Sequence, residues 1–161
     1  MISISFLLAI AFACTKSVDA TVPATDISSS GVNKAIILQL VNDARKRGCQ
    51  CGDAYYPPAA SVTWNDQLEK AALDHSNDML ENSYFSHTNK KGNSAGIRIK
   101  EAGYRWSIYG ENIAHGYSTE KAVVEGWLSS SGHCSNIMSR LFTEMGVAKA
   151  GSYWTQDFAT K

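Results

Sequence analysis

Two histidines and a glutamate of this 161-residue chain are the side chains that could together hold a metal ion or move a proton. His87 stands in the segment FSHT, Glu111 in GENIA and His133 in SSSGHC, so long stretches of sequence separate them. Two imidazoles and a carboxylate suit zinc, and three protein ligands would leave one coordination position open. The chain has no HExxH or comparable local signature, so any joint site depends on the fold.

A nucleophilic site is the alternative chemistry, because a serine or cysteine beside a base can be activated. Ser86, Ser131 and Cys134 lie next to or near the two histidines in sequence. We interpret the two serines as loop residues and Cys134 as a disulfide partner. Glu111 also has a second interpretation, in which it only orients the imidazoles by hydrogen bonding.

The chain has four cysteines: Cys14, Cys49, Cys51 and Cys134. The first pair in the domain is spaced C-x-C, and no second closely spaced pair follows, which argues against a zinc ribbon or a redox motif. Cys14 is expected to leave with an N-terminal signal or to carry its lipid, so in an oxidising compartment the other three cysteines should form one disulfide and leave one thiol. Cys51 immediately precedes the turn at Gly52, so we predict a Cys51–Cys134 disulfide with Cys49 as the free thiol. A Cys49–Cys134 pair is the alternative.

The first 20 residues are typical of a secretory signal peptide. Their apolar run, residues 2–13, is too short to cross a bilayer, and Val18-Asp19-Ala20 offers small residues for cleavage. Alternatively, the signal ends before Cys14, which would then carry a lipid and anchor the protein to the cell envelope. We predict a secreted, extracellular protein with a flexible linker at 21–33, a domain at 34–161 and no membrane span.

Composition excludes one class of partner. Lys and Arg together number 15, as do Asp and Glu, so the formal net charge is zero. No basic surface for nucleic acid is therefore expected. The length after residue 33 suits one domain with its own core, and we expect a monomer.

Helical periodicity, capping residues and glycine positions predict the elements that must position these side chains. Predicted helices precede Gly48, begin at Asn65 or Asp66, and fall within 94–104 and 119–130. A strand is expected over 107–116 and a β-hairpin over 144–158, whereas 49–60 and the serine-rich turn at His133 are expected to be loops. This order of elements predicts an α+β fold with an antiparallel sheet covered by helices.

Four segments together resemble the CAP superfamily of cysteine-rich secretory, antigen 5 and pathogenesis-related proteins, also called SCP domains. They are HSNDMLENSYFSHT, GENIA, VVEGWLSSSGH and GVAKAGSYWTQDF. They occur in the family's order, and the likeness covers about residues 35–161, most like the compact secreted prokaryotic members. The resemblance implies a three-layer α-β-α sandwich with a central antiparallel sheet.

The resemblance also implies a cleft with two histidines and two acidic residues. The histidines correspond to His87 and His133, and the first acid corresponds to Glu111. Ser130 stands where the family has its second glutamate, so the set is incomplete in this chain. Many relatives hold a divalent ion there, commonly zinc, and we expect zinc here.

The expected function is that of a secreted binding module whose His/Glu cleft holds a divalent metal. Its expected ligand is a lipid or another small apolar molecule. A metal-dependent, peptidase-like hydrolase using the same cleft is the first alternative. A structural protein of the cell envelope is the second.

Overall fold

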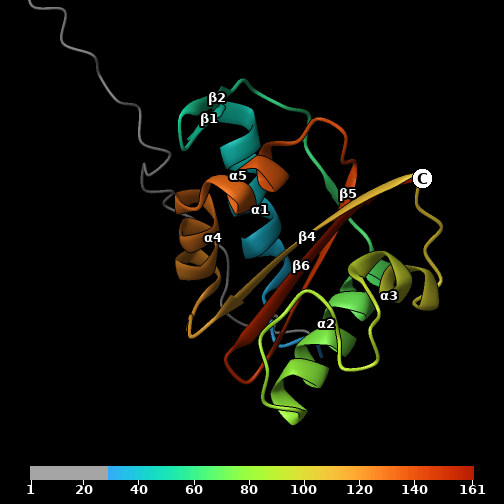
Figure 1. Ribbon diagram of the computed structural model, residues 1–161. Coiled ribbons are helices and arrows are strands. Elements are labelled where there is room, and N and C mark those ends of the chain that lie inside the picture. The colour runs from blue at the N-terminus through green and yellow to red at the C-terminus, as the bar shows by residue number, and fades with distance from the viewer. Residues whose placement is uncertain (1–28) are drawn as a thin grey trace, which may run out of the picture.

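The computed structural model describes residues 29–161 (Figure 1). The predicted signal peptide, the alternative lipidation site at Cys14 and most of the predicted linker lie outside the described residues. The elements within residues 29–161 are α1 (Lys34–Arg47), β1 (Cys49–Cys51), β2 (Ala54–Tyr56), β3 (Thr63–Trp64), α2 (Asp66–Glu81), α3 (Ala95–Glu101), β4 (Ile108–His115), α4 (Glu120–Ser129), α5 (Ser131–Met138), β5 (Glu144–Ala150) and β6 (Tyr153–Thr160).

The sheet forms the middle of three layers, as predicted. Its strand order is β3-β5-β6-β4, which makes β4 an edge strand. Helices α2 and α3 lie on one side of the sheet, and α1, α4 and α5 lie on the other (Figure 1). The long strands β4, β5 and β6 are antiparallel, whereas the two-residue strand β3 joins β5 in parallel.

The predicted helix starts coincide with capping side chains. The Asn33 side chain accepts from Ile36 N–H, the Asn65 side chain accepts from Gln67 and Leu68 N–H, and Thr119 accepts from Ala122 N–H. Each cap satisfies a backbone donor that a helix leaves unpaired at its N-terminus. These short-range bonds explain why the sequence alone located the starts of α2 and α4, whereas the start of α1 at Asn33 was not predicted.

Two segments predicted as loops have regular structure. Residues 49–56 form the β1–β2 hairpin, closed by Gly52 at a φ of 61°. The predicted turn around His133 is helix α5, which starts directly after α4 because Ser130 ends one helix and begins the next. The helix buries Cys134, Ile137 and Met138, a stripe too short to recognise in the sequence.

The packed part of the chain begins before residue 34, although 21–33 was predicted to be a flexible linker. Ser30, Val32 and Asn33 are buried. Lys149 N–H donates to the carbonyl of Ser30 at 2.8 Å, and Asn33 N–H donates to Glu120 Oε1 at 2.8 Å. Backbone groups buried in this way need partners, and the sheet and α4 provide them.

Helix α2 packs directly against the backbone of β5. A Cβ added at Gly146 would lie 2.0 Å from the backbone nitrogen of Glu69, a distance that no side chain tolerates. Glycine is therefore required for the helix to approach the sheet so closely. This contact fixes α2, and with it the start of the following segment, which carries His87.

On the other side of the sheet from α2, Arg45 of α1 connects three segments of the layer that contains α1, α4 and α5. The residue is buried on α1, and its guanidinium donates four hydrogen bonds to backbone carbonyls. The acceptors are Ala60 (2.7 Å), Ile137 (2.7 Å), Ser139 (2.8 Å) and Phe142 (3.2 Å). Arg45 thus satisfies carbonyls at the C-terminal end of α5, in the segment that follows α5 and in the segment between β2 and β3.

Candidate functional site

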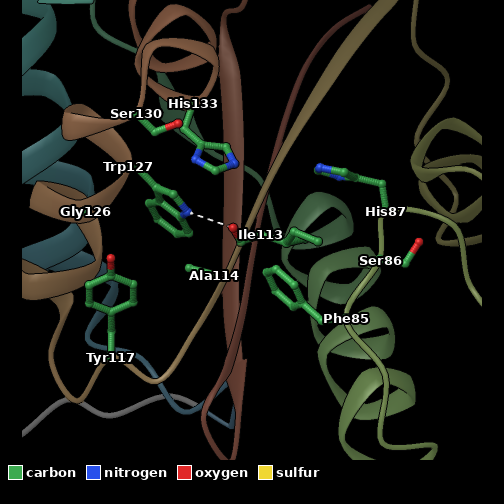
Figure 2. Close-up of a pocket in the computed structure, with 10 residues that line it drawn as sticks. All are labelled: Phe85, Ser86, His87, Ile113, Ala114, Tyr117, Gly126, Trp127, Ser130 and His133. Atoms are coloured by element: carbon green, nitrogen blue, oxygen red, sulfur yellow. Dashed lines mark hydrogen bonds between the residues drawn. The ribbon is translucent and has the colours of Figure 1, made fainter.

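A cleft of about 490 Å³ opens beside the edge strand β4. Three parts of the chain line it, and Figure 2 shows their side chains. They are the segment after α2 (Phe85, Ser86, His87), β4 with the following residues (Ile113, Ala114, Tyr117), and α4–α5 (Gly126, Trp127, Ser130, His133). His87 and His133 stand on opposite sides of the cleft and point toward each other, with Ile113 between them (Figure 2).

His87 is held by Glu111. The Nδ1 of His87 lies 2.7 Å from Oε1 of Glu111, which is almost fully buried, whereas the His87 side chain is 57% exposed. A carboxylate can only accept, so the hydrogen of this bond is on Nδ1. The Nε2 atom of His87 is then the nitrogen that is available to the cleft.

The second oxygen of Glu111 accepts a hydrogen bond from the buried side chain of Arg98. Arg98 also donates to the backbone carbonyls of His87 (2.8 Å) and Asn93 (3.0 Å). The guanidinium therefore holds both the carboxylate and the loop that carries the histidine. Since both oxygens of Glu111 are engaged, the geometry favours an orienting role for Glu111 over direct metal ligation.

His133 lies on α5 and is half-buried. Burial lowers the pKa of the His133 imidazole, and the nearby His87 lowers it further. Both effects disfavour the positive charge. At neutral pH the ring is therefore neutral, with a nitrogen lone pair for a metal ion or for a hydrogen bond from a ligand.

The carbonyls of β4 are covered from the α4–α5 side. The Trp127 indole donates to the carbonyl of Ile113 at 3.3 Å, the bond drawn in Figure 2. The Asn136 side chain donates to the carbonyl of Glu111 at 3.1 Å and to Asn112 Oδ1 at 2.9 Å. These bonds fix the strand that forms the floor of the cleft.

The two histidines and Glu111 do not form a compact three-ligand cluster. Within residues 29–161, the group of three potential ligands whose donor atoms lie within 4.8 Å of one another is Cys49, Cys51 and Cys134. These sulfurs are engaged in disulfides, so they do not offer thiolates to a metal. Two facing imidazoles are the donor set that the cleft provides (Figure 2).

The structure joins Cys51 to Cys134, the pair chosen from the sequence. The bond attaches α5, and therefore His133, to the β1–β2 hairpin. The prediction that Cys49 is a free thiol was wrong, because Cys49 is also disulfide-bonded and no cysteine within residues 29–161 is free.

The other histidines lie outside the cleft. His115 is exposed, and its Nε2 lies 2.8 Å from Oγ of Ser152 on the β5–β6 turn. His75 is completely buried on α2, and its Nε2 donates to the carbonyl of Ser86 at 2.9 Å. We interpret His75 as a structural residue that anchors the loop before His87.

His75 predicts a pH dependence of stability. Burial lowers its pKa, only partly offset by nearby Glu111, so its neutral form stabilises the fold. This contribution is present above the unfolded-state pKa of about 6.5 and is lost as the pH falls through the lower folded-state pKa. Between pH 7.5 and 5.0 the wild type should lose more unfolding free energy than His75→Gln, measured by urea denaturation. Equal losses would contradict this assignment.

Two residues at the site were not identified from the sequence. Arg98 lies on the buried face of α3, and Asp157 lies directly opposite Glu111 in the β4–β6 pairing. Nothing in the sequence distinguished Asp157, because Thr155 and Gln156 in the same segment, WTQDF, are also polar. Ser130, at the position of the family's second acid, lines the cleft but brings no carboxylate to it.

Comparison with known proteins gives consistent matches. A sequence profile of the cysteine-rich secretory protein family, CAP, matches residues 38–158. The "Uncharacterized membrane protein YlbC" of Bacillus subtilis (strain 168) is 40% identical over 99 residues, which cover 62% of this chain and 29% of that protein. The chain thus spans less than a third of this curated relative.

Two solved structures have the same fold. An extracellular protein containing an SCP domain from Bacillus anthracis str. Ames has a TM-score of 0.70 and 32% identity, covering 79% of this chain and 40% of that chain. An outer surface protein from Borrelia burgdorferi has a TM-score of 0.67 and 20% identity, covering 79% of this chain and 91% of that chain. Within residues 29–161 no helix has the length and apolar character needed to cross a membrane.

Proposed function

Because this chain belongs to the cysteine-rich secretory protein family, CAP, we propose that it is an extracellular binding domain whose cleft holds a divalent metal ion between His87 and His133. The observation that carries the proposal is the pair of imidazoles pointing toward each other across the cleft (Figure 2). Zinc is coordinated by nitrogen atoms of neutral imidazoles. Because Nδ1 of His87 is bonded to Glu111, Nε2 of His87 is the nitrogen that would coordinate the metal. When bound, the metal would supply a Lewis-acidic anchor for a polar group of the ligand.

The walls of the cleft support a ligand that is largely apolar. Phe85, Ile113, Ala114 and Trp127 line the cleft together with the two histidines. A volume of about 490 Å³ is in the range of sites for small molecules. A lipid or another small apolar molecule with one polar end fits such a cleft: its apolar part would contact the apolar residues, and its polar end would lie near the two imidazoles.

Secretion is supported by two features. Disulfides persist in oxidising compartments, and Cys51–Cys134 is one. The solved relative from Bacillus anthracis is described as extracellular.

A metal-dependent hydrolase is the second candidate. It needs a general base positioned near a metal-bound water. Among the described residues, those lining the cleft include no carboxylate, and Glu111 is committed to His87 and Arg98. The geometry therefore favours binding over hydrolysis. If the zinc-loaded protein turned over peptide or ester substrates, and His133→Ala abolished this turnover, hydrolysis would be favoured over binding.

Calorimetric titration with zinc tests the metal site. His87→Ala and His133→Ala should each weaken zinc binding at least roughly tenfold, because each removes one of two imidazole ligands. His115→Ala is the matched control, since that histidine is exposed and bonds Ser152, and it should bind zinc like the wild type. Wild-type affinity in His87→Ala would refute the site.

A further inference from the structure

A buried polar cluster lies beneath His87. It consists of Glu111, Arg98 and Asp157, whose residues expose 9%, 5% and 0% of their surface. Glu111 on β4 and Asp157 on β6 are directly opposite each other in the antiparallel pairing, so their side chains leave the same face of the sheet. Arg98 reaches this place from α3 and donates to Glu111.

The cluster holds two carboxyl groups but one guanidinium. Burial raises the pKa of Asp157 well above its ordinary value, and the neighbouring Glu111 raises it further. Two adjacent buried carboxyl groups beside one cation disfavour a second negative charge, so Asp157 keeps its proton. Within the described residues no other group hydrogen-bonds to the Asp157 oxygens, and Glu111, directly opposite on β4, is the neighbouring acceptor for the Asp157 proton.

The Glu111 carboxylate is therefore oriented by a neighbour that can only donate hydrogen bonds. Arg98 has donors only, so the Glu111 atom that faces it must be an acceptor. Arg98 is itself held by the carbonyls of His87 and Asn93, which prevents it from following a displaced carboxylate. The remaining oxygen, Oε1, is directed at Nδ1 of His87.

We propose that Arg98 and Asp157 are positioning residues that fix the Glu111 carboxylate and thereby set the tautomer of His87. The ring carries its hydrogen on Nδ1 and presents the lone pair of Nε2 to the cleft. The consequence for metal affinity rests on the proposed function, whereas the tautomer is a property of the metal-free protein. The two are therefore measured separately.

The ring nitrogens of histidine report the tautomer directly in ¹⁵N–¹H NMR correlation spectra. In metal-free protein at pH 8 with a chelator present, His87 should be mainly the Nδ1–H form. Glu111→Gln should reverse this, because Arg98 requires the amide oxygen and turns the amide NH₂ toward His87. Nδ1 then becomes the acceptor, and the ring becomes mainly the Nε2–H form.

A matched pair of substitutions tests Asp157. Asp157→Asn keeps a donor toward Glu111 and should retain the Nδ1–H form. Asp157→Leu, of similar size, removes the donor, lets the Glu111 carboxylate shift away from Nδ1 of His87 and should therefore increase the Nε2–H fraction. His115, which bonds Ser152, should keep its signals in every variant and thus report that the protein is folded. A structural role alone would make Asn and Leu equivalent.

The outcomes separate this inference from the metal site. An Nε2–H form of His87 in the wild type, or an unchanged tautomer in Glu111→Gln, would overturn the inference even if zinc binds. A reversed tautomer in Glu111→Gln with a roughly 10- to 100-fold weaker zinc affinity supports both proposals. A reversed tautomer with unchanged zinc affinity keeps the positioning role and removes His87 from the metal site.

Discussion

Replacing Arg45 with methionine is expected to lower the free energy of unfolding by about 4–5 kcal/mol. Methionine retains an apolar stem in the buried space but removes the donors to four backbone carbonyls. Each buried carbonyl that loses a charged donor without gaining water costs free energy, and the C-terminal end of α5 loses two such bonds. Burial lowers the pKa of Arg45, and the four bonds offset this cost of holding its charge inside the protein.

Urea denaturation followed by tryptophan fluorescence measures this change. Arg47→Met is the matched control, because Arg47 lies two residues later on α1 and is exposed. Its unfolding free energy should change by less than about 0.5 kcal/mol. Similar losses in both variants would mean that helix propensity or net charge, rather than the carbonyl contacts, accounts for the effect.

Removing the Cys51–Cys134 disulfide should produce a loss of similar size. The bond closes a sequence separation of 83 residues, so in the chain-entropy model its absence costs roughly 4–5 kcal/mol. The double variant Cys51→Ala, Cys134→Ala is expected to show this loss in denaturation. It should also bind zinc more weakly, because α5 and His133 lose their attachment to the hairpin.

Ser131→Ala is the control for that experiment. Ser131 is exposed on the same helix, and its substitution should leave both stability and zinc affinity near the wild-type values. A double cysteine variant with wild-type stability would show that the packing of α5, without the covalent bond, is sufficient to hold His133.

The parts of the fold that follow short-range rules could be predicted from the sequence. Asn65 and Thr119 marked helix starts, Gly48 marked the end of α1, and the strand predicted over 107–116 and the hairpin predicted over 144–158 correspond to β4 and to β5 with β6. The α-β-α arrangement and the family were confirmed. Helix α5 and strand β3 were missed, because eight and two residues are too few to establish a period, and tertiary contacts determine their conformation.

The residues of the candidate site likewise fall into those that the sequence identified and those that only the tertiary structure reveals. The resemblance to a known family identified His87, Glu111 and His133, which the structure brings to one cleft and its wall. Arg98 and Asp157 could not be paired with Glu111 from sequence, because the register of β4 on β6 and the docking of α3 decide that contact. Periodicity indicates which face a residue occupies, but not which residue lies across from it.

Strand β4 is at once the floor of an open cleft and the unpaired edge of a sheet. Exposed edges of this kind offer their backbone groups to strands of other molecules and so promote aggregation. Here the indole of Trp127 and the amide of Asn136 already occupy the outward carbonyls of Ile113 and Glu111. A neighbouring chain that added a strand would have to displace both, so the cleft can stay open beside β4 without offering a template for intermolecular β-pairing.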